Sequence, residues 1–263
     1  MVSNQSLQRG LTILDLLDRA PSPLGIRELA RLMELSPTIV QRLINTLVVA
    51  GYVEQVAETR RYKLGYRAMQ LGGAMITEDR LISLAAKELQ QLADSHLLNG
   101  YLGALRNNRV VYLHSVQSSG PVVVRIAVGS QVNAHSTALG KILLAELPVT
   151  SVKSIVGKPP YEQFTPRTIT QWSALASELE VTRGRGFAIS REENIAGIVS
   201  FGALVRNAEG DAVAALSVAG IAIEEAKWPA TVQLVLDAAY RCSTSLGYRG
   251  AAIKVSGLKG LAA

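Results

Sequence analysis

One helix with a sharply defined start and a single apolar face constrains the fold of this chain more than any other feature. Its start is marked by Ser36, whose hydroxyl can accept an amide hydrogen of the first turn, and by Pro37, which suits a position where no amide hydrogen is needed. Apolar residues at i, i+3, i+4 and i+7 then predict one buried stripe, made of Val40, Leu43, Ile44 and Leu47. The other faces carry side chains that can contact base edges or phosphates, namely Thr38, Gln41, Arg42 and Asn45. This pattern is typical of a DNA recognition helix.

Two shorter helical patterns precede this segment. The first carries leucines at helical spacing, at Leu7, Leu11, Leu14 and Leu17. The second follows a proline-containing break at 21–23 and carries Ile26, Leu29, Ala30 and Met33. Only a few residues, 34–36, separate the second helix from the third, so the two helices must cross sharply. We therefore predict a helix-turn-helix.

A two-stranded hairpin is predicted directly after the third helix. Gly51 can end that helix, and Val53, Tyr62 and Leu64 alternate with polar residues on either side of a tip at 57–60. Such a hairpin is the wing of a winged helix-turn-helix. The candidate DNA contacts of the helix and the wing together are Ser36, Thr38, Gln41, Arg42, Asn45, Arg60, Arg61 and Lys63. Because residues 1–70 hold only nine Lys and Arg against six Asp and Glu, and because small units of this kind also bind proteins, a protein partner stays open as the alternative.

Composition limits the class of protein and its surroundings. No run approaches the roughly 18 consecutive apolar residues of a membrane span, and the beginning of the chain has no secretory signal, so we expect a cytoplasmic protein without a membrane partner. The single cysteine, Cys242, cannot form an internal disulfide. One Cys and three scattered His also argue against a metal site, and we expect no cofactor. The net charge of +6 favours polyanionic partners.

A length of 263 residues suits a small DNA-binding domain joined to a larger one. We expect the winged unit over 1–71, a linker region over 72–79, a second domain over 80–250 and a tail over 251–263. Helical spacing runs to about His96, and a pair of glycines, Gly72 and Gly73, can mark either a hinge or a close helix packing point.

The second domain is predicted to be α+β, with a mainly antiparallel sheet and helices around it. Asn107 and Asn108 tolerate positive φ and indicate a hairpin turn. The six expected strands are Tyr101–Leu105, Val110–Val116, Val122–Val128, Gly186–Ser190, Ile198–Val205 and Ala212–Ala219. Helices are expected at about 137–146, 171–183 and 224–246.

Taken together, four segments resemble the IclR family of bacterial transcriptional regulators along almost the whole chain. They are Leu7–Leu14, the end of the wing at Arg61–Gly65, Ala134–Ala145, and the stretch from Gly184 through Glu193 to Gly220. The resemblance implies an N-terminal winged helix-turn-helix and a C-terminal GAF-like domain that binds a small effector. It also implies a homodimer or homotetramer on a palindromic operator in double-stranded DNA. Repression is favoured only because it is the usual mode of action in the family.

A candidate effector site lies around the turn before the helix at 138–146. Thr137 can cap that helix, its free amide hydrogens can attract a carboxylate, and Gly140 lets the backbone approach a ligand. The resemblance adds hydroxyls on facing strands and an apolar wall. The candidate effector-binding residues are Pro121, Val124, Thr137, Ala138, Leu139, Gly140, Ser190, Ser200 and Ser217. Thr137 can also be only a cap, and Ser217 can serve only a neighbouring backbone group.

Departures from the family pattern bear on specificity. Family members often carry a polar residue where this chain has Ala219, and a proline where it has Leu204. Both changes make the pocket more apolar, so a small organic acid of aromatic or branched shape is expected. A Lys-Ser-Thr common in the family's reading helix is Pro37-Thr38-Ile39 here, which removes one positive charge and predicts a different operator.

The sequence gives no support for an enzyme. His96, His114, His135 and Cys242 lie in no nucleophile elbow, phosphate loop or metal-ligand spacing. The glycine pair at 184–186 precedes a strand rather than following one, so it is not a dinucleotide fingerprint. We therefore expect a sequence-specific DNA-binding regulator, with a ligand sensor that binds a protein partner as the alternative.

Overall fold

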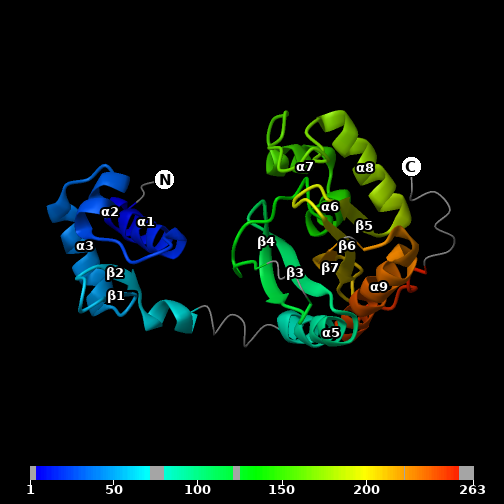
Figure 1. Cartoon of the computed structure of the whole chain (residues 1–263), viewed down its shortest axis with the longest axis horizontal. Helices are drawn as coiled ribbons and strands as arrows, with labels where there is room; N and C mark the ends of the chain where they lie inside the picture. Colours follow the sequence, from blue (N-terminus) through cyan, green and yellow to red (C-terminus); the bar gives the residue numbers. More distant parts are fainter. Residues whose placement is uncertain (1–3, 72–79, 121–124, 222, 255–263) are drawn as a thin grey trace. The chain divides into compact units, whose positions relative to one another are not determined.

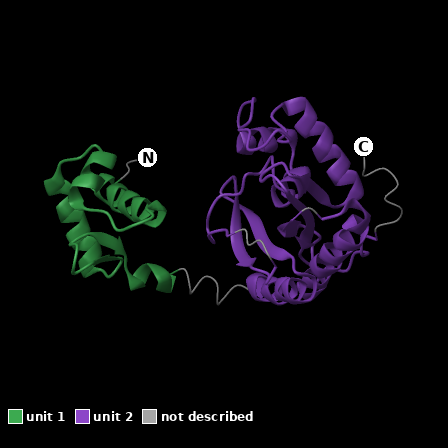
Figure 2. Ribbon diagram, in the orientation of Figure 1, with its two compact units in different colours: residues 1–79 green, residues 80–263 purple. Residues whose placement is uncertain are grey.

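The computed structural model describes residues 4–71, 80–120, 125–221 and 223–254. It divides into two compact units, Met1–Asp79 (unit 1) and Arg80–Ala263 (unit 2), which Figure 2 shows in different colours. The linker expected at 72–79, with Gly72 and Gly73, and most of the expected tail lie outside the described residues. No helix among the described residues is long and apolar enough to cross a membrane.

Unit 1 is the winged helix-turn-helix that the sequence predicts. Its elements are α1 (Gln5–Arg19), α2 (Ile26–Leu32), α3 (Pro37–Val49), β1 (Val53–Gln55) and β2 (Tyr62–Leu64), and residues 66–71 are helical. Strands β1 and β2 pair antiparallel with Val53 opposite Leu64. Leu24 extends the wing, because its backbone exchanges two hydrogen bonds with that of Tyr62. The core joins all five elements through Ile13, Leu29, Val40, Ile44, Val53 and Tyr62.

The predicted start and end of the recognition helix α3 are confirmed. The Ser36 hydroxyl accepts the amide hydrogen of Ile39 at 3.4 Å, and Pro37 is the first helical residue. After the helix, Gly51 has φ +78°, a conformation that favours glycine at the end of a helix.

The leucines at helical spacing along α1 differ in exposure. Leu7 and Leu11 are 63% and 55% exposed, whereas Ile13, which the leucine spacing missed, is fully buried beside Leu17. The buried side chains of α1, Ile13 and Leu17, both lie in its second half. Helical spacing of the leucines therefore does not by itself indicate which of them are buried.

Unit 2 is an antiparallel sheet with helices on both faces (Figure 1). The strands are β3 (Asn99–Arg106), β4 (Arg109–Val116), β5 (Ala188–Arg191), β6 (Ile198–Arg206) and β7 (Ala212–Ile221), in the spatial order β4-β3-β7-β6-β5. One face is covered by α5 (Arg80–His96) and α9 (Trp228–Ser245), and the other by α6 (Ala138–Ala145) and α8 (Trp172–Arg185). Neighbouring residues of one strand consequently enter different layers: Leu102 packs under α5 and α9, while Tyr101 packs on the α6 side.

The hairpin at Asn107 and Asn108 is confirmed, with φ values of 48° and 61°. The sheet has five strands among the described residues rather than the six expected. Residues 121–124 of the expected strand Val122–Val128 lie outside the described residues, and 125–128 are not a strand. Instead the chain turns at Gly129 (φ +87°), and the backbone of 129–132 hydrogen bonds to β4.

Two helices differ from expectation. Helix α7 (Val149–Val156) was not predicted. The last helix begins at Trp228 rather than near residue 224, after a short 3-10 turn, η1 (Glu225–Lys227). Both differences lie at the periphery of unit 2, so the layers around the sheet are unchanged.

Candidate functional site

The recognition helix α3 presents an exposed polar face in unit 1. Thr38, Arg42 and Asn45 are exposed on it, and Gln41 is partly buried. The Gln41 amide group donates to Asn45 Oδ1 at 2.9 Å and to the Tyr62 hydroxyl oxygen at 3.4 Å. Ser36 is exposed but its hydroxyl is engaged as the helix cap. The face therefore combines one cation with donors and acceptors that can reach base edges.

The wing carries three cations, and two of them have partners within unit 1. Arg61 lies 3.1 Å from Glu28 and donates to the Pro23 carbonyl at 3.0 Å. The pKa of Glu28 is lowered, first by the hydrogen bond from the Gly25 amide and then by Arg61. Lys63 pairs with Glu54 at 3.5 Å. Arg60, at the exposed tip, has no ion pair within the described part of the chain, and the same holds for Arg42 on α3.

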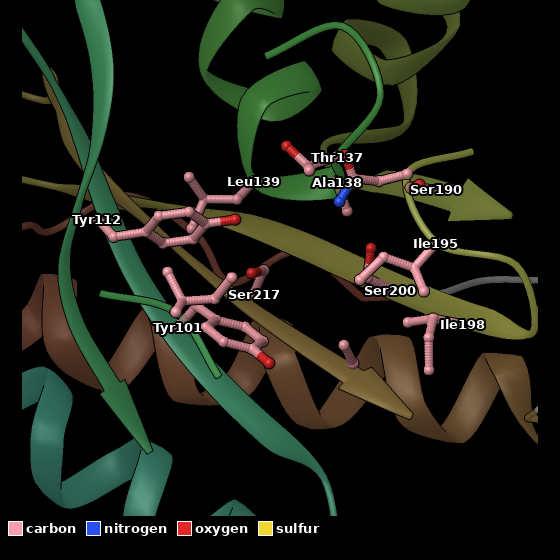
Figure 3. Close-up of a pocket in the computed structure, with 13 residues that line it drawn as sticks. Tyr101, Tyr112, Thr137, Ala138, Leu139, Ser190, Ile195, Ile198, Ser200 and Ser217 are labelled. Carbon is pink, nitrogen blue, oxygen red and sulfur yellow. The ribbon is translucent and has the colours of Figure 1, made fainter. Parts of the chain in front are cut away.

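A cavity in unit 2 lies between the sheet and the first turn of α6. Its volume is about 50 Å³, which is smaller than the roughly 300–1,000 Å³ typical of sites for drug-sized ligands. In Figure 3, Tyr101 and Tyr112 stand at one end of the cavity and Ile195 and Ile198 at the other. The full set of lining residues is Tyr101, Tyr112, Ile126, Thr137, Ala138, Leu139, Ser190, Asn194, Ile195, Ile198, Ser200, Ser217 and Ala219.

The start of α6 forms one wall of this cavity. Thr137 caps the helix, since its hydroxyl accepts the Gly140 amide at 3.1 Å and donates to the Asn133 carbonyl at 2.9 Å. Gly202 on β6 lets α6 approach the sheet closely, because a Cβ there would lie 2.7 Å from the Ala138 carbonyl oxygen. Ala138 and Leu139 of this first turn line the cavity, and the first amide hydrogens of a helix have no partner within the helix.

Three serines reach the cavity from adjacent strands. Sheet register places Ser190 opposite Ser200, and Ser217 opposite Tyr101. The Ser190 hydroxyl donates to the Ser136 carbonyl at 2.7 Å, so it keeps only acceptor capacity for a ligand. The hydroxyls of Ser200 and Ser217 make no hydrogen bond with any described residue, and both remain able to donate.

Two tyrosines close the end of the cavity that lies away from Ile195 and Ile198. The rings of Tyr101 and Tyr112 lie 5.9 Å apart between centroids and are tilted by 59°. Burial raises the pKa of Tyr101 above its usual range, and raises that of Tyr112 to about 12. Both phenols are therefore neutral at physiological pH and provide aromatic surface with a polar tip.

A buried ion network supports the isoleucine end of the cavity. Lys141 on α6 is 1% exposed, and its Nζ lies 2.7 Å from Glu193 Oε1 and 3.3 Å from Glu178 Oε1. Burial raises the pKa of Glu193, although Lys141 and the Arg191 amide act in the opposite direction. Glu193 directly precedes Asn194 and Ile195, so the pair anchors the segment that supplies this wall. None of the residues that line the cavity is charged.

Six of the nine candidate effector residues line the cavity: Thr137, Ala138, Leu139, Ser190, Ser200 and Ser217. Pro121 and Val124 lie outside the described residues. Gly140 does not line the cavity, because it faces the Ala134 backbone, where a Cβ would come within 2.3 Å of Cα. Leu204, expected to make the pocket more apolar, also lies elsewhere, whereas Ala219 does line it.

Sequence reasoning missed the tyrosines and the isoleucines of the wall. Alternation along β3 could have placed Tyr101 on the same face as Gly103, the residue that contacts α6. No local signal identifies Asn194 or Ile195, because they lie in an irregular segment whose position depends on the buried ion network.

Comparisons with known proteins agree for both units. The family model for the IclR helix-turn-helix domain matches residues 6–57, and the model for the bacterial transcriptional regulator IclR C-terminal domain matches residues 73–244. The transcriptional regulator XynR of Escherichia coli K12 is 29% identical over 93% of this chain and 98% of its own length. The transcriptional repressor AllR of the same strain is 27% identical over 93% and 91%.

A solved structure has the same fold. It is an IclR homologue from Microbacterium hydrocarbonoxydans in complex with 4-hydroxybenzoate, which superposes with a TM-score of 0.82 at 22% identity, covering 92% of this chain and 99% of that one.

Proposed function

Because this chain belongs to the IclR family of bacterial transcriptional regulators, we propose that a small organic acid bound in the unit 2 cavity controls its affinity for an operator sequence. The family and the relatives are helix-turn-helix transcriptional regulators and not enzymes, which confirms that expectation for this chain. What is proposed here is the ligand class, its site and the DNA contacts.

The observation that carries the proposal is the polarity of the cavity. One wall combines the first turn of α6 with the free hydroxyls of Ser200 and Ser217, all of them donors, while no cationic side chain lines the cavity. Backbone amides at a helix N-terminus together with hydroxyls bind a carboxylate without a salt bridge. Tyr101 and Tyr112 supply aromatic surface, and Tyr101 lies directly across the sheet from Ser217. An aromatic monocarboxylate matches this distribution of donors and apolar surface.

The Microbacterium homologue, which was solved with 4-hydroxybenzoate, makes that compound a reasonable first probe. Its carboxylate would meet the α6 turn and the serines, and its ring would pack toward the tyrosines. Branched carboxylates form the second group of probes, because Ile195, Ile198 and Ala219 also make part of the wall apolar.

On the DNA side, we propose that α3 enters the major groove with Thr38, Gln41, Arg42 and Asn45, and that the wing contacts the backbone through Arg60. Arg61 and Lys63 have acidic partners within unit 1, so their contribution to DNA is weaker than that of Arg60. We also propose a homo-oligomer on a palindromic operator and, since AllR is named a repressor, repression as the mode of action.

The test is fluorescence anisotropy of the purified full chain on a labelled duplex from upstream of its own gene, at two salt concentrations and against a scrambled duplex. We expect preferential binding to the native duplex that weakens steeply as salt rises, because phosphate contacts release counterions. Binding that is equally weak on both duplexes would contradict recognition of this sequence. Complete absence of binding at low salt would favour a protein partner for unit 1 instead.

A further inference from the structure

The segment that connects β5 to β6 forms part of the wall of the unit 2 cavity and part of its mouth. Asn194, Ile195 and Ile198 all line the cavity. Ile195 is at the same time 39% exposed, so it lies where the cavity meets solvent. Ile195 and Ile198 stand together at one end of the cavity in Figure 3. Movement of this segment would therefore change the width of the site.

Both ends of the segment are held in place. At its start, the Glu193 carboxylate lies 2.7 Å from the buried Lys141 ammonium group on α6. At its end, Ile198 belongs to β6, and its carbonyl accepts the amide hydrogen of Glu192 at 2.9 Å. Four residues, 194–197, lie between these two fixed points.

Asn194 joins these four residues to the wall at the start of α6. Its amide group lies at hydrogen-bond distance from the Asn133 amide group and from the Ser136 hydroxyl, 3.0 Å in both cases. Each amide carries a donor and an acceptor, and a hydroxyl can be either, so these bonds also form when both amide groups are turned over. Asn133 and Ser136 lead into the first turn of α6 but do not line the cavity themselves. They hold the wall closed from outside the site.

The cavity closed in this way is too small for the ligand class proposed above. Its volume is about 50 Å³, whereas a cavity of about 150 Å³ holds one benzene molecule. A carboxylate with an aromatic ring therefore needs a wider site. The walls do not part easily at Glu193, because its buried pair with Lys141 is costly to break. The segment 194–197 has weaker attachments, so the widening falls to it.

We infer that Asn133 and Ser136 determine the size of ligand that the site accepts, because they hold 194–197 in the closed position and an aromatic carboxylate binds only when this segment detaches from them. The inference rests on the proposed function of the cavity. When only a small fraction of a protein is in the binding-competent state, its apparent affinity is reduced by that fraction. Loss of either contact enlarges the open fraction, and binding becomes tighter although a hydrogen bond has been removed.

The experiment is isothermal titration calorimetry of the full chain with benzoate and with 4-hydroxybenzoate. Asn133→Ala is the main variant, because Asn133 is exposed and lies outside the cavity. A double variant adds Ser136→Ala and removes the second contact. Ser154→Ala is the matched control: it removes a hydrogen bond of 2.8 Å to Asn108 on the surface of unit 2, and Ser154 does not line the cavity.

We expect Asn133→Ala to bind both compounds about two- to tenfold more tightly than the wild type, which corresponds to the usual net contribution of one hydrogen bond. The double variant binds more tightly again. Both compounds gain by the same factor, because both need the same opening. Ser154→Ala keeps the dissociation constants of the wild type.

Unchanged or weaker binding by Asn133→Ala would overturn the inference. A gain for only one of the two compounds would also overturn it, because that result indicates a new contact with one ligand and not a wider site. Both results leave the proposed function intact, since the wild type still binds the acid. If neither the wild type nor any variant binds either compound, the proposed ligand class and this inference fail together.

Discussion

Removing the positive charge of Lys141 tests how strongly unit 2 depends on its buried ion network. Lys141→Met keeps the length of the side chain but leaves Glu193 buried without its cation, with Oε2 already lacking a hydrogen bond. Breaking one side of a buried pair costs about 3–5 kcal/mol. Glu178 still keeps Arg185 at 3.1 Å, so only one carboxylate loses its partner. We expect a loss of about 3 kcal/mol in the free energy of unfolding.

The pH dependence provides a second signature. Burial already raises the pKa of Glu193, with Lys141, Glu178 and Arg185 as its charged neighbours, and removal of Lys141 raises this pKa further. An acid whose folded pKa is raised binds its proton more tightly when folded, so stability is lost as pH rises from the unfolded value, about 4.3, through the folded one. The penalty of Lys141→Met should therefore shrink as pH falls toward about 4.

Urea unfolding followed by tryptophan fluorescence measures this penalty in the full chain, because both tryptophans, Trp172 and Trp228, lie in unit 2. Lys87→Met, on the exposed side of α5, is the control and should change stability by less than about 0.5 kcal/mol. Lys141→Met with Glu193→Leu removes both charges and should recover more than half of the loss. A cost under about 1 kcal/mol for Lys141→Met at pH 7, or a double variant no more stable than the single one, would show that unit 2 does not depend on this ion pair.

Three further predictions concern single residues. Arg42→Ala should weaken operator binding by about 1–3 kcal/mol and relax one base position; unchanged anisotropy titrations would remove Arg42 from the reading set. Arg60→Ala should reduce the slope of log K against log salt concentration by about 1, the value for one lost phosphate contact, while Arg61→Ala leaves this slope nearly unchanged. Equal slopes for the two variants would contradict the ion pairing of Arg61. Gly140→Ala should destabilise unit 2 by about 1–3 kcal/mol through its clash with the Ala134 backbone, and a wild-type urea midpoint would show that this contact relaxes at no cost.

Features set by local chemistry could be predicted from the sequence. Ser36 and Pro37 determine the start of α3 through a cap and a missing amide hydrogen, and Asn107 and Asn108 determine a hairpin through their tolerance of positive φ. These signals act within a few residues, so they hold whatever surrounds them. The same is true of Thr137, whose capping bond depends only on the residue three positions later.

Features set by tertiary contacts could not be predicted. The spacing of Leu7 and Leu11 is helical, but both are exposed in the folded chain, which the spacing does not show. The sequence predicts that Gly140 lets the backbone approach a ligand closely. In the structure Gly140 instead allows close packing against the Ala134 backbone. Arg61 is one of three wing cations by sequence, and only the folded position of Glu28 shows that it has a partner.

The central claim is that the unit 2 cavity controls DNA affinity, and one comparison tests it most directly. A panel of small aromatic and branched carboxylates is first ranked by the rise in thermal stability of unit 2, followed by tryptophan fluorescence. The dissociation constant for the duplex from upstream of the protein's own gene is then measured with and without the best compound, for the wild type and for Ser217→Val. We predict a change of about 5- to 150-fold in the wild type, the usual range of allosteric coupling, and little change in the variant. No change with any stabilising compound, or an equal change in both proteins, would contradict the account.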